Sequence, residues 1–170
     1  MSVKIQEKMR NALFFLLVIV SAAAFAQKIV PLNGYPKFNI LLTDNTHFKS
    51  SELKKNTSLI LIYFAPDCYH CRSFIGNFMG AIKKFSQTQI VLVSHVPISE
   101  LKKFSKDFSL NTYSNIKIGT EGNSFYLPSY FKIGNFPFTA LYNKAGKLIA
   151  TYSEAPTMDV LASKVNEKKF

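Results

Sequence analysis

The feature that most constrains the fold is an unbroken apolar stretch at residues 59–64. A run of this kind is typical of a strand covered on both faces, which belongs to a sheet with helices packed on either side. Pro66 and Asp67 end the strand, and Asp67 can cap the helix that follows. From Cys71 onward, apolar residues recur at helical spacing, namely Phe74, Ile75, Phe78, Met79, Ile82 and Phe85. A buried strand followed directly by such a helix predicts an α/β fold.

The rest of the chain continues this alternation of strands and helices. Further strands are predicted at residues 38–42, 46–48, 89–94, 115–119, 138–142 and 147–152. Further helices are predicted from Ser50 or Ser51 to Lys55, after a cap at Ser99, over residues 124–133 in short or irregular form, and after a cap at Thr157. The sequence therefore predicts an α/β sandwich with a mixed central sheet, helices on both faces and an N-terminal hairpin.

The chain has two cysteines, Cys68 and Cys71, where the predicted strand gives way to the helix. A helix start presents unpaired N–H groups and the positive end of the backbone dipole, so it favours ionisation of a cysteine. We therefore expect Cys68 to be the attacking thiolate. A second thiol one turn later can attack a mixed disulfide and release the partner, which is the expected role of Cys71. The reactive group would be the Cys68–Cys71 disulfide, with no other cofactor and no metal.

The first residues resemble a secretory signal peptide. Basic residues precede an apolar stretch at 12–20, and Ala24-Phe25-Ala26 supplies small residues where a signal peptidase cleaves. We expect residues 1–26 to be removed and residues 27–170 to form one domain. Export places the chain in an oxidising compartment, where a lone cysteine pair indicates a redox couple. The expected location is the bacterial periplasm, and anchoring by an uncleaved leader is the less favoured alternative.

The net charge of +11 raises the question of a nucleic-acid partner. The lysines are scattered in pairs, at Lys54-Lys55, Lys83-Lys84, Lys102-Lys103 and Lys168-Lys169. This distribution favours a solvated surface over a nucleic-acid footprint, although attraction to an anionic membrane or an acidic partner stays open. The expected partners are protein thiols or disulfides and a membrane or periplasmic electron-transfer protein, and the expected state is a monomer.

Three segments together resemble thioredoxin-fold proteins. They are the strand end Phe64-Ala65-Pro66-Asp67, the Cys68-Tyr69-His70-Cys71 at the helix start, and the stretch 134–142 that leads into Gly146-Lys147-Leu148. An N-terminal hairpin and an insert after the second core strand make the chain similar to the exported TlpA/ResA-like branch, over about residues 31–155. The resemblance implies that Pro137 is cis and packs beside the dithiol. The backbone of Phe136 would then pair with an extended substrate.

Two positions depart from the pattern of thioredoxin itself. Thioredoxin carries a buried acid six residues before its first cysteine, and Ile62 stands at that position here. The proton acceptor for Cys71 is therefore not identified by the resemblance. Thioredoxin also has a proline that bends the active-site helix, where this chain has Gly76. Glycine permits a bend but does not impose one.

Residues around the thiols give opposing indications of the direction of electron flow. His70 can stabilise the Cys68 thiolate, which favours an oxidant, as in DsbA-like proteins. Asp67 opposes this effect by like-charge repulsion. The layout of the chain resembles the reducing TlpA/ResA-like proteins, so we favour a reductant and keep a DsbA-like oxidant as the alternative.

Other functions on a related fold are less well supported. A copper-delivery protein of the Sco type could use Cys68, Cys71, His70 and His95, but those proteins place three residues between their cysteines. Arg72 stands where covalent haem attachment needs a histidine. A peroxiredoxin would need Thr or Ser at the position of Ala65 and proline at that of Leu61. A non-catalytic binding module remains an alternative, with the many aromatic residues as its surface.

Overall fold

The computed structural model describes residues 34–166, which contain one mixed seven-stranded sheet. Its strands are β1 (Asn39–Leu42), β2 (His47–Lys49), β3 (Leu59–Tyr63), β4 (Gln89–Ser94), β5 (Ile116–Thr120), β6 (Phe138–Tyr142) and β7 (Leu148–Tyr152). Their order across the sheet is β2-β1-β5-β4-β3-β6-β7. Strands β3, β4 and β5 are parallel, and the remaining pairs are antiparallel. The predicted hairpin is therefore present as β1 and β2, and it joins the sheet through β5.

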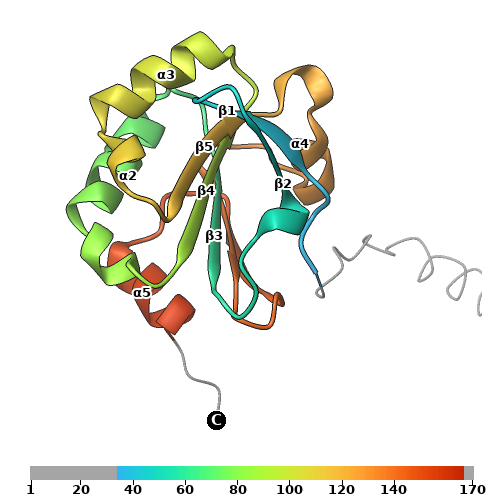
Figure 1. Cartoon of the computed structure of the whole chain (residues 1–170). Coiled ribbons are helices and arrows are strands. Elements are labelled where there is room, and N and C mark those ends of the chain that lie inside the picture. The colour runs from blue at the N-terminus through green and yellow to red at the C-terminus, as the bar shows by residue number, and fades with distance from the viewer. Residues whose placement is uncertain (1–33, 167–170) are drawn as a thin grey trace, which may run out of the picture. The chain divides into compact units, whose positions relative to one another are not determined.

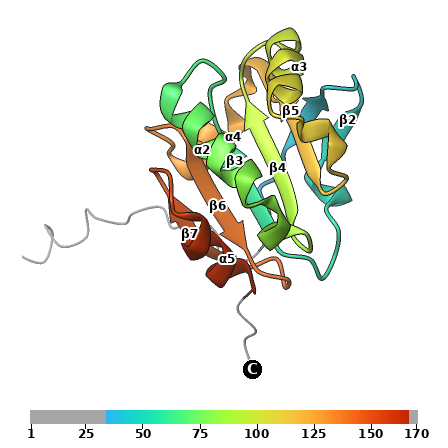
Figure 2. The same cartoon turned by 90° about the vertical axis from the view of Figure 1, so that its left-hand side faces the viewer.

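Helices cover both faces of this sheet, as the sequence predicted (Figure 1). The α-helices are α2 (Tyr69–Gly80), α3 (Ile98–Asp107), α4 (Tyr126–Phe131) and α5 (Met158–Asn166), and short 3-10 helices occur at η1 (Ser50–Glu52), η2 (Ile82–Phe85), η3 (Leu110–Thr112) and η4 (Gly122–Ser124). Helices α2, α3 and α5 lie on one face (Figures 1 and 2). Helix α4 lies on the other face, where the ring of Phe131 is 5.1 Å from the ring of Phe138 in β6, measured between centroids.

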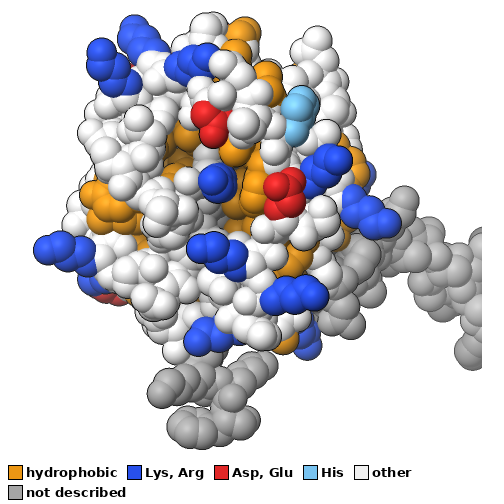
Figure 3. All heavy atoms as spheres, in the orientation of Figure 1, with side chains coloured by type: hydrophobic (Ala, Val, Ile, Leu, Met, Phe, Trp, Pro, Cys, Tyr) orange, Lys and Arg blue, Asp and Glu red, His pale blue; other side chains and the backbone are white. Residues whose placement is uncertain are grey.

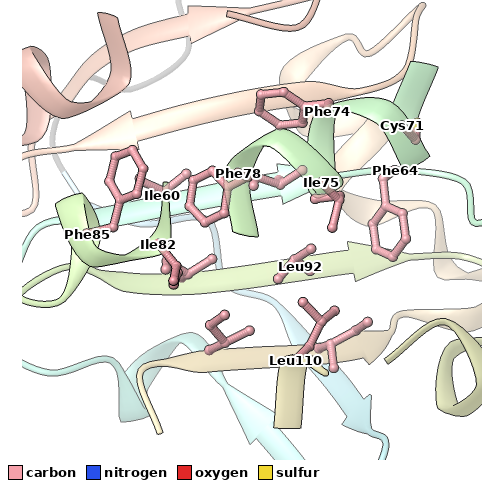
Figure 4. Packing of buried hydrophobic residues seen from close by; sticks show 14 of the residues in the cluster. Ile60, Phe64, Cys71, Phe74, Ile75, Phe78, Ile82, Phe85, Leu92 and Leu110 are labelled. Atoms are coloured by element: carbon pink, nitrogen blue, oxygen red, sulfur yellow. The ribbon is translucent and has the colours of Figure 1, made fainter. Parts of the chain in front are cut away.

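The apolar stretch at residues 59–64 forms the central strand β3 and the residue that follows it. All five of its residues are buried, and it pairs with β4 on one side and β6 on the other. Since successive side chains of a strand point to opposite faces, Ile60 and Ile62 meet the α2 face whereas Tyr63 points toward the α4 face. Figure 4 shows the resulting cluster between α2 and the sheet, with Cys71 at one end of it.

Two predicted helix caps are wrong, and one is confirmed. Cys68, not Asp67, is the N-cap of α2, because the chain turns one residue later than expected. Helix α3 has Pro97 at its N-cap and begins at Ile98, so Ser99 lies within its first turn. Thr157 does cap α5, since its hydroxyl accepts a hydrogen bond from the Val160 N–H at 3.3 Å. The backbone of Pro97 is extended directly before α3, and its side chain has no hydrogen-bond acceptor. The usual capping residues, Ser and Thr, therefore do not mark this helix start in the sequence.

Two further expectations concern helix lengths. The helix predicted from Ser50 or Ser51 to Lys55 is only the 3-10 turn η1. Helix α2 runs without interruption through Gly76, and its predicted apolar continuation after Gly80 is the 3-10 helix η2. Glycine at position 76 is thus accommodated within a regular α-helix.

The predicted signal peptide, residues 1–26, lies outside the described residues. Within residues 34–166, none of the helices has the length and apolar character needed to cross a membrane. On the face shown in Figure 3, the Lys and Arg side chains are spread out and do not gather into one patch. That face matches the scattered distribution expected from the sequence.

Candidate active site

Cys68 lies in the short connection between β3 and α2, with its side chain partly accessible. Its backbone is extended, and its N–H donates to the Ala65 carbonyl at 3.2 Å, which closes the turn after the strand. The sulfur accepts a hydrogen bond from the Cys71 N–H at 3.4 Å. Cys68 Sγ therefore occupies the place of a capping oxygen, at the positive end of the helix dipole. This is the environment that favours a thiolate nucleophile.

Cys71 lies in the first turn of α2 and is completely buried. It belongs to the same apolar cluster as Ile62, Phe74 and Ile75 (Figure 4). Burial raises the pKa of the Cys71 thiol to about 12; the neighbouring Cys68 and Asp67 add to this effect, and a backbone hydrogen bond at Ala65 opposes it. Both cysteines are free thiols in the structure. The two sulfurs thus differ in accessibility, as a division into attacking and resolving thiols requires.

The buried thiol makes the stability of the reduced protein depend on pH. The folded state keeps the Cys71 proton up to a pKa of about 12, whereas an unfolded chain loses it near 9. The resulting stabilisation is complete below pH 9 and is lost as the pH rises toward 12. From pH 9 to about pH 10.5, we expect the free energy of unfolding to fall by up to about 2 kcal/mol more than in a Cys71→Ala variant. Urea unfolding under reducing conditions measures this difference, and identical pH slopes would contradict it.

The peptide bond between Phe136 and Pro137 is cis, as the resemblance implied. Pro137 is buried directly before β6, and Phe136 is partly buried. Phe136 and Cys68 both pack against the cluster that contains Cys71. The cis-proline segment and the dithiol therefore contact the same apolar cluster.

The two residues expected to modulate the thiols are both exposed. Asp67 precedes Cys68, and its carboxylate contributes to the raised pKa of Cys71. His70 lies in the first turn of α2, with its ring edge-on to Tyr69 at 5.7 Å. Ile62 is fully buried in the cluster around Cys71, so the position of the thioredoxin acid is apolar here.

A charged cleft lies between the loop before Cys68 and helix α3. It has a volume of about 340 Å³ and is lined by Pro66, Asp67, Arg72 and residues of α3. The Arg72 guanidinium is 3.3 Å from the Asp107 carboxylate and lies over the rings of Phe104 and Phe108 at 5.5 and 5.3 Å. It also donates to the Pro66 carbonyl at 3.3 Å. Arg72 therefore ties the loop before Cys68 to helix α3.

A buried polar pair on the opposite face was not predicted. The Tyr63 hydroxyl donates to Glu121 Oε1 at 2.9 Å, and Glu121 Oε2 accepts from the Leu127 N–H at 3.1 Å. Burial, with the adjacent Glu121, raises the pKa of Tyr63, so the phenol remains a donor. Glu121 thereby ties the ends of β5 and β3 to the first turn of α4. An acid placed directly after a buried strand was the available signal in the sequence.

Three further rings lie next to Tyr63, and we call Tyr63, Phe136, His95 and Phe125 the aromatic row. Tyr63 is 5.6 Å from Phe136 and stacks on His95 at 6.5 Å. His95 is 6.4 Å from Phe136 and 5.4 Å from Phe125. His95 Nδ1 is buried and has no hydrogen-bond partner within residues 34–166. Among these residues, no three or more His, Cys, Asp and Glu side chains form a group that could hold a metal ion, so the copper-ligand set of Cys68, Cys71, His70 and His95 is not assembled.

Comparison with known proteins gives a consistent family and fold. Residues 39–130 match the family model described as Thioredoxin. The chain is similar in structure to a secreted Mycobacterium tuberculosis disulfide oxidoreductase homologous to E. coli DsbE, with 14% identity and a TM-score of 0.62 over 76% of this chain and 94% of that chain. It is also similar to an exposed lipoprotein thioredoxin of Streptococcus pneumoniae, with 18% identity and a TM-score of 0.62 over 76% of this chain and 97% of that one.

A third similar structure is StoA of Bacillus subtilis, with 18% identity and a TM-score of 0.58 over 76% of this chain and 97% of that chain. At these identities the likeness to solved structures shows the fold. A search of curated proteins finds no match.

Proposed function

This chain belongs to the thioredoxin family, and we propose that it is an exported thiol–disulfide oxidoreductase that exchanges disulfides with protein substrates. The observation that carries the proposal is the pairing of a partly accessible Cys68 at a helix N-terminus with a buried Cys71 one turn later. The cis bond before Pro137 supports it, since thioredoxin-fold proteins pair such a segment with an extended partner, and the Phe136 backbone would have that role here.

In the reducing direction, the Cys68 thiolate attacks one sulfur of a partner disulfide. A bond forms between Cys68 and that sulfur, and the partner's other sulfur leaves as a thiolate. Cys71 then gives its proton to the partner thiolate that has already left, and the Cys71 sulfur attacks Cys68 Sγ. The Cys68–Cys71 bond forms, the mixed disulfide breaks, and two electrons have passed from the chain to the partner. Oxidation of a partner dithiol is the same sequence in reverse.

Removing the resolving thiol should trap the partner. In a Cys71→Ser variant, the mixed disulfide on Cys68 cannot be displaced from within, so we expect covalent adducts to accumulate in the producing cells. Non-reducing electrophoresis and mass spectrometry detect them. Cys71→Ala is a second variant, because it keeps this buried position apolar. The matched control replaces both cysteines; if the folded single variants trap no more protein than this control, the non-catalytic binding function is favoured.

We further propose that the chain acts as a reductant of the TlpA/ResA-like kind. The support is the layout of the chain, which resembles that of the reducing TlpA/ResA-like proteins, together with the exposed Asp67 carboxylate directly before Cys68, whose charge opposes negative charge on the reduced pair. We expect a reduction potential below about −250 mV against glutathione, and a more positive value in Asp67→Asn. A wild-type value near about −120 mV would instead identify a DsbA-like oxidant.

The proposed location is the bacterial periplasm. The apolar leader expected at residues 1–26 supports it, and two of the similar structures are of proteins described as secreted or as an exposed lipoprotein. The proposed partners are accordingly exported proteins with disulfides and a membrane or periplasmic donor that reduces Cys68–Cys71 again.

A further inference from the structure

The loop of residues 65–67, between β3 and α2, contacts both cysteines through its backbone. The Ala65 carbonyl accepts a hydrogen bond from the Cys68 N–H at 3.2 Å. Burial raises the pKa of Cys71, and a backbone hydrogen bond at Ala65 lowers it. A hydrogen bond to a charged sulfur stabilises it most when donor and acceptor are well aligned. The position of this loop therefore affects how readily the buried Cys71 can lose its proton and attack.

Arg72 holds this loop from within the helix that follows it. The Arg72 guanidinium donates a hydrogen bond to the Pro66 carbonyl at 3.3 Å. The Arg72 backbone N–H donates to the Cys68 carbonyl at 3.0 Å. The side chain thus reaches back from α2 to a residue before the N-cap of that helix, and it fixes the loop by its middle peptide group.

Helix α3 supports both the residue before the loop and the arginine that holds it. The ring of Phe104 is 4.8 Å from the ring of Phe64 and 5.5 Å from the Arg72 guanidinium. Phe108 lies 5.3 Å from the same guanidinium, and the Asp107 carboxylate pairs with it at 3.3 Å. A planar guanidinium can stack on rings and donate in two directions at once, which a lysine ammonium cannot do. Arg72 is therefore fixed by α3 on one side while it holds the loop on the other.

The ion pair alone does not explain this arrangement. The side chains of Arg72 and Asp107 are 43% and 38% exposed, and exposed ion pairs contribute little to stability. Lys84 and Asp159 form another exposed pair, between η2 and α5. Arg72 differs from Lys84 because it also bonds the loop that contacts both cysteines. The extra contacts of Arg72 therefore point to a role in the reaction of the dithiol.

We propose that Arg72 is a positioning residue for the second step of disulfide exchange. It holds the loop of residues 65–67 against α3 through the Pro66 carbonyl, and the loop keeps its backbone aligned with the Cys71 sulfur while that sulfur displaces the partner. Arg72 acts through the loop. This inference rests on the proposed function, and it names a side chain that sets the rate at which Cys71 resolves the mixed disulfide.

The test follows the two steps of exchange separately, in the reduced full-length protein with an excess of dithiobisnitrobenzoate, a small aromatic disulfide. In the first step, the Cys68 thiolate attacks the reagent, and one nitrothiobenzoate leaves. In the second step, Cys71 gives its proton to solvent, and its sulfur attacks Cys68 Sγ. The Cys68–Cys71 bond forms, and the second nitrothiobenzoate leaves. Stopped-flow absorbance records both releases, and the second has a rate that does not depend on the concentration of reagent.

We expect Arg72→Gln to slow the second step about tenfold, because small misplacements of reacting groups have large effects on rate. Arg72→Lys keeps the positive charge but cannot stack and donate in two directions, so we expect it to slow this step at least about threefold. Lys84→Gln is the matched control, because it removes the cation of an exposed ion pair in η2, and it should keep the wild-type rate. A wild-type rate in Arg72→Gln would overturn the inference. A wild-type rate in Arg72→Lys would also overturn it, because charge alone would then be sufficient.

The support from α3 is tested by Asp107→Ala. Since Asp107 is expected to act by fixing Arg72, this substitution should slow the second step about twofold in the wild-type protein and have no effect when combined with Arg72→Gln. Equal slowing in both backgrounds would show that Asp107 acts independently of Arg72, which contradicts the proposed arrangement. General loosening of the fold would expose Cys71 and give it easier access to Cys68, so a slower second step is not the result expected from loss of structure.

Failure of the proposed function has a separate signature. If the wild-type protein releases no second nitrothiobenzoate and forms no Cys68–Cys71 disulfide, the oxidoreductase proposal fails. If the wild-type protein completes both steps and the Arg72 variants complete them equally fast, only the positioning inference fails.

Discussion

Replacing Cys68 by serine is expected to lower the rate of disulfide reduction by at least about a thousandfold. The serine hydroxyl is a far weaker nucleophile near neutral pH, and no disulfide with Cys71 can form. Cys71 cannot substitute for the missing thiol, because it is completely buried and its pKa is raised to about 12. Reduction of insulin or a peptide disulfide with dithiothreitol as electron source measures the effect.

The fold should survive this substitution, which makes the result interpretable. Cys68 is the N-cap of α2 and accepts the Cys71 N–H, and serine is a favourable residue at that position. Circular dichroism and urea unfolding should therefore resemble those of the reduced wild-type protein. A folded Cys68→Ser variant that keeps a tenth or more of the activity would show that another group is the nucleophile.

Gly119→Ala is expected to destabilise the protein by about 3 kcal/mol or more. Gly119 lies in β5 opposite Leu42, where the N-terminal hairpin joins the sheet. A Cβ atom there would lie 2.6 Å from the Leu41 carbonyl oxygen and 3.1 Å from Ile40 Cδ1. Because the nearest atom is backbone in a paired strand, relief requires the hairpin to shift. The midpoint of urea unfolding measures the loss.

The same substitution at Gly76 is the control, and its expected effect has the opposite sign. Gly76 lies within α2, where an added Cβ would be 3.7 Å from Phe108, an ordinary contact distance. Alanine favours a helix interior by up to about 1 kcal/mol over glycine, so Gly76→Ala should stabilise the protein slightly. Loss of stability in both variants would indicate a general intolerance of added volume, and it would contradict the explanation for Gly119.

The fold could be predicted from the sequence where the signal was local. Residues 59–64 marked a central strand because burial on both faces excludes polar residues, and β3 occupies that stretch. The helix after Cys71 was visible from its apolar spacing. The cis bond before Pro137 followed from the resemblance, since cis and trans proline have the same local pattern.

The sequence was less informative where a feature depends on distant segments. Glu121 and Tyr63 are 58 residues apart, and their hydrogen bond follows from the parallel order of β3, β4 and β5. The left-handed backbone of Phe125 is invisible in the sequence, because residues other than Gly and Asn seldom adopt it. The N-cap of α2 is Cys68 and not Asp67, so a sulfur accepts the hydrogen bond that a carboxylate oxygen was expected to accept.

The unequal burial of the two sulfurs also has a consequence for damage by peroxide. An oxidant reaches Cys68 first, so a sulfenic acid would form on that sulfur alone. Cys71 follows one turn later and can condense with it, which yields the disulfide and water before the irreversible sulfinic stage. We therefore expect mass spectrometry after mild peroxide treatment to show loss of two hydrogens in the wild-type protein, and added oxygen where Cys71 has been replaced.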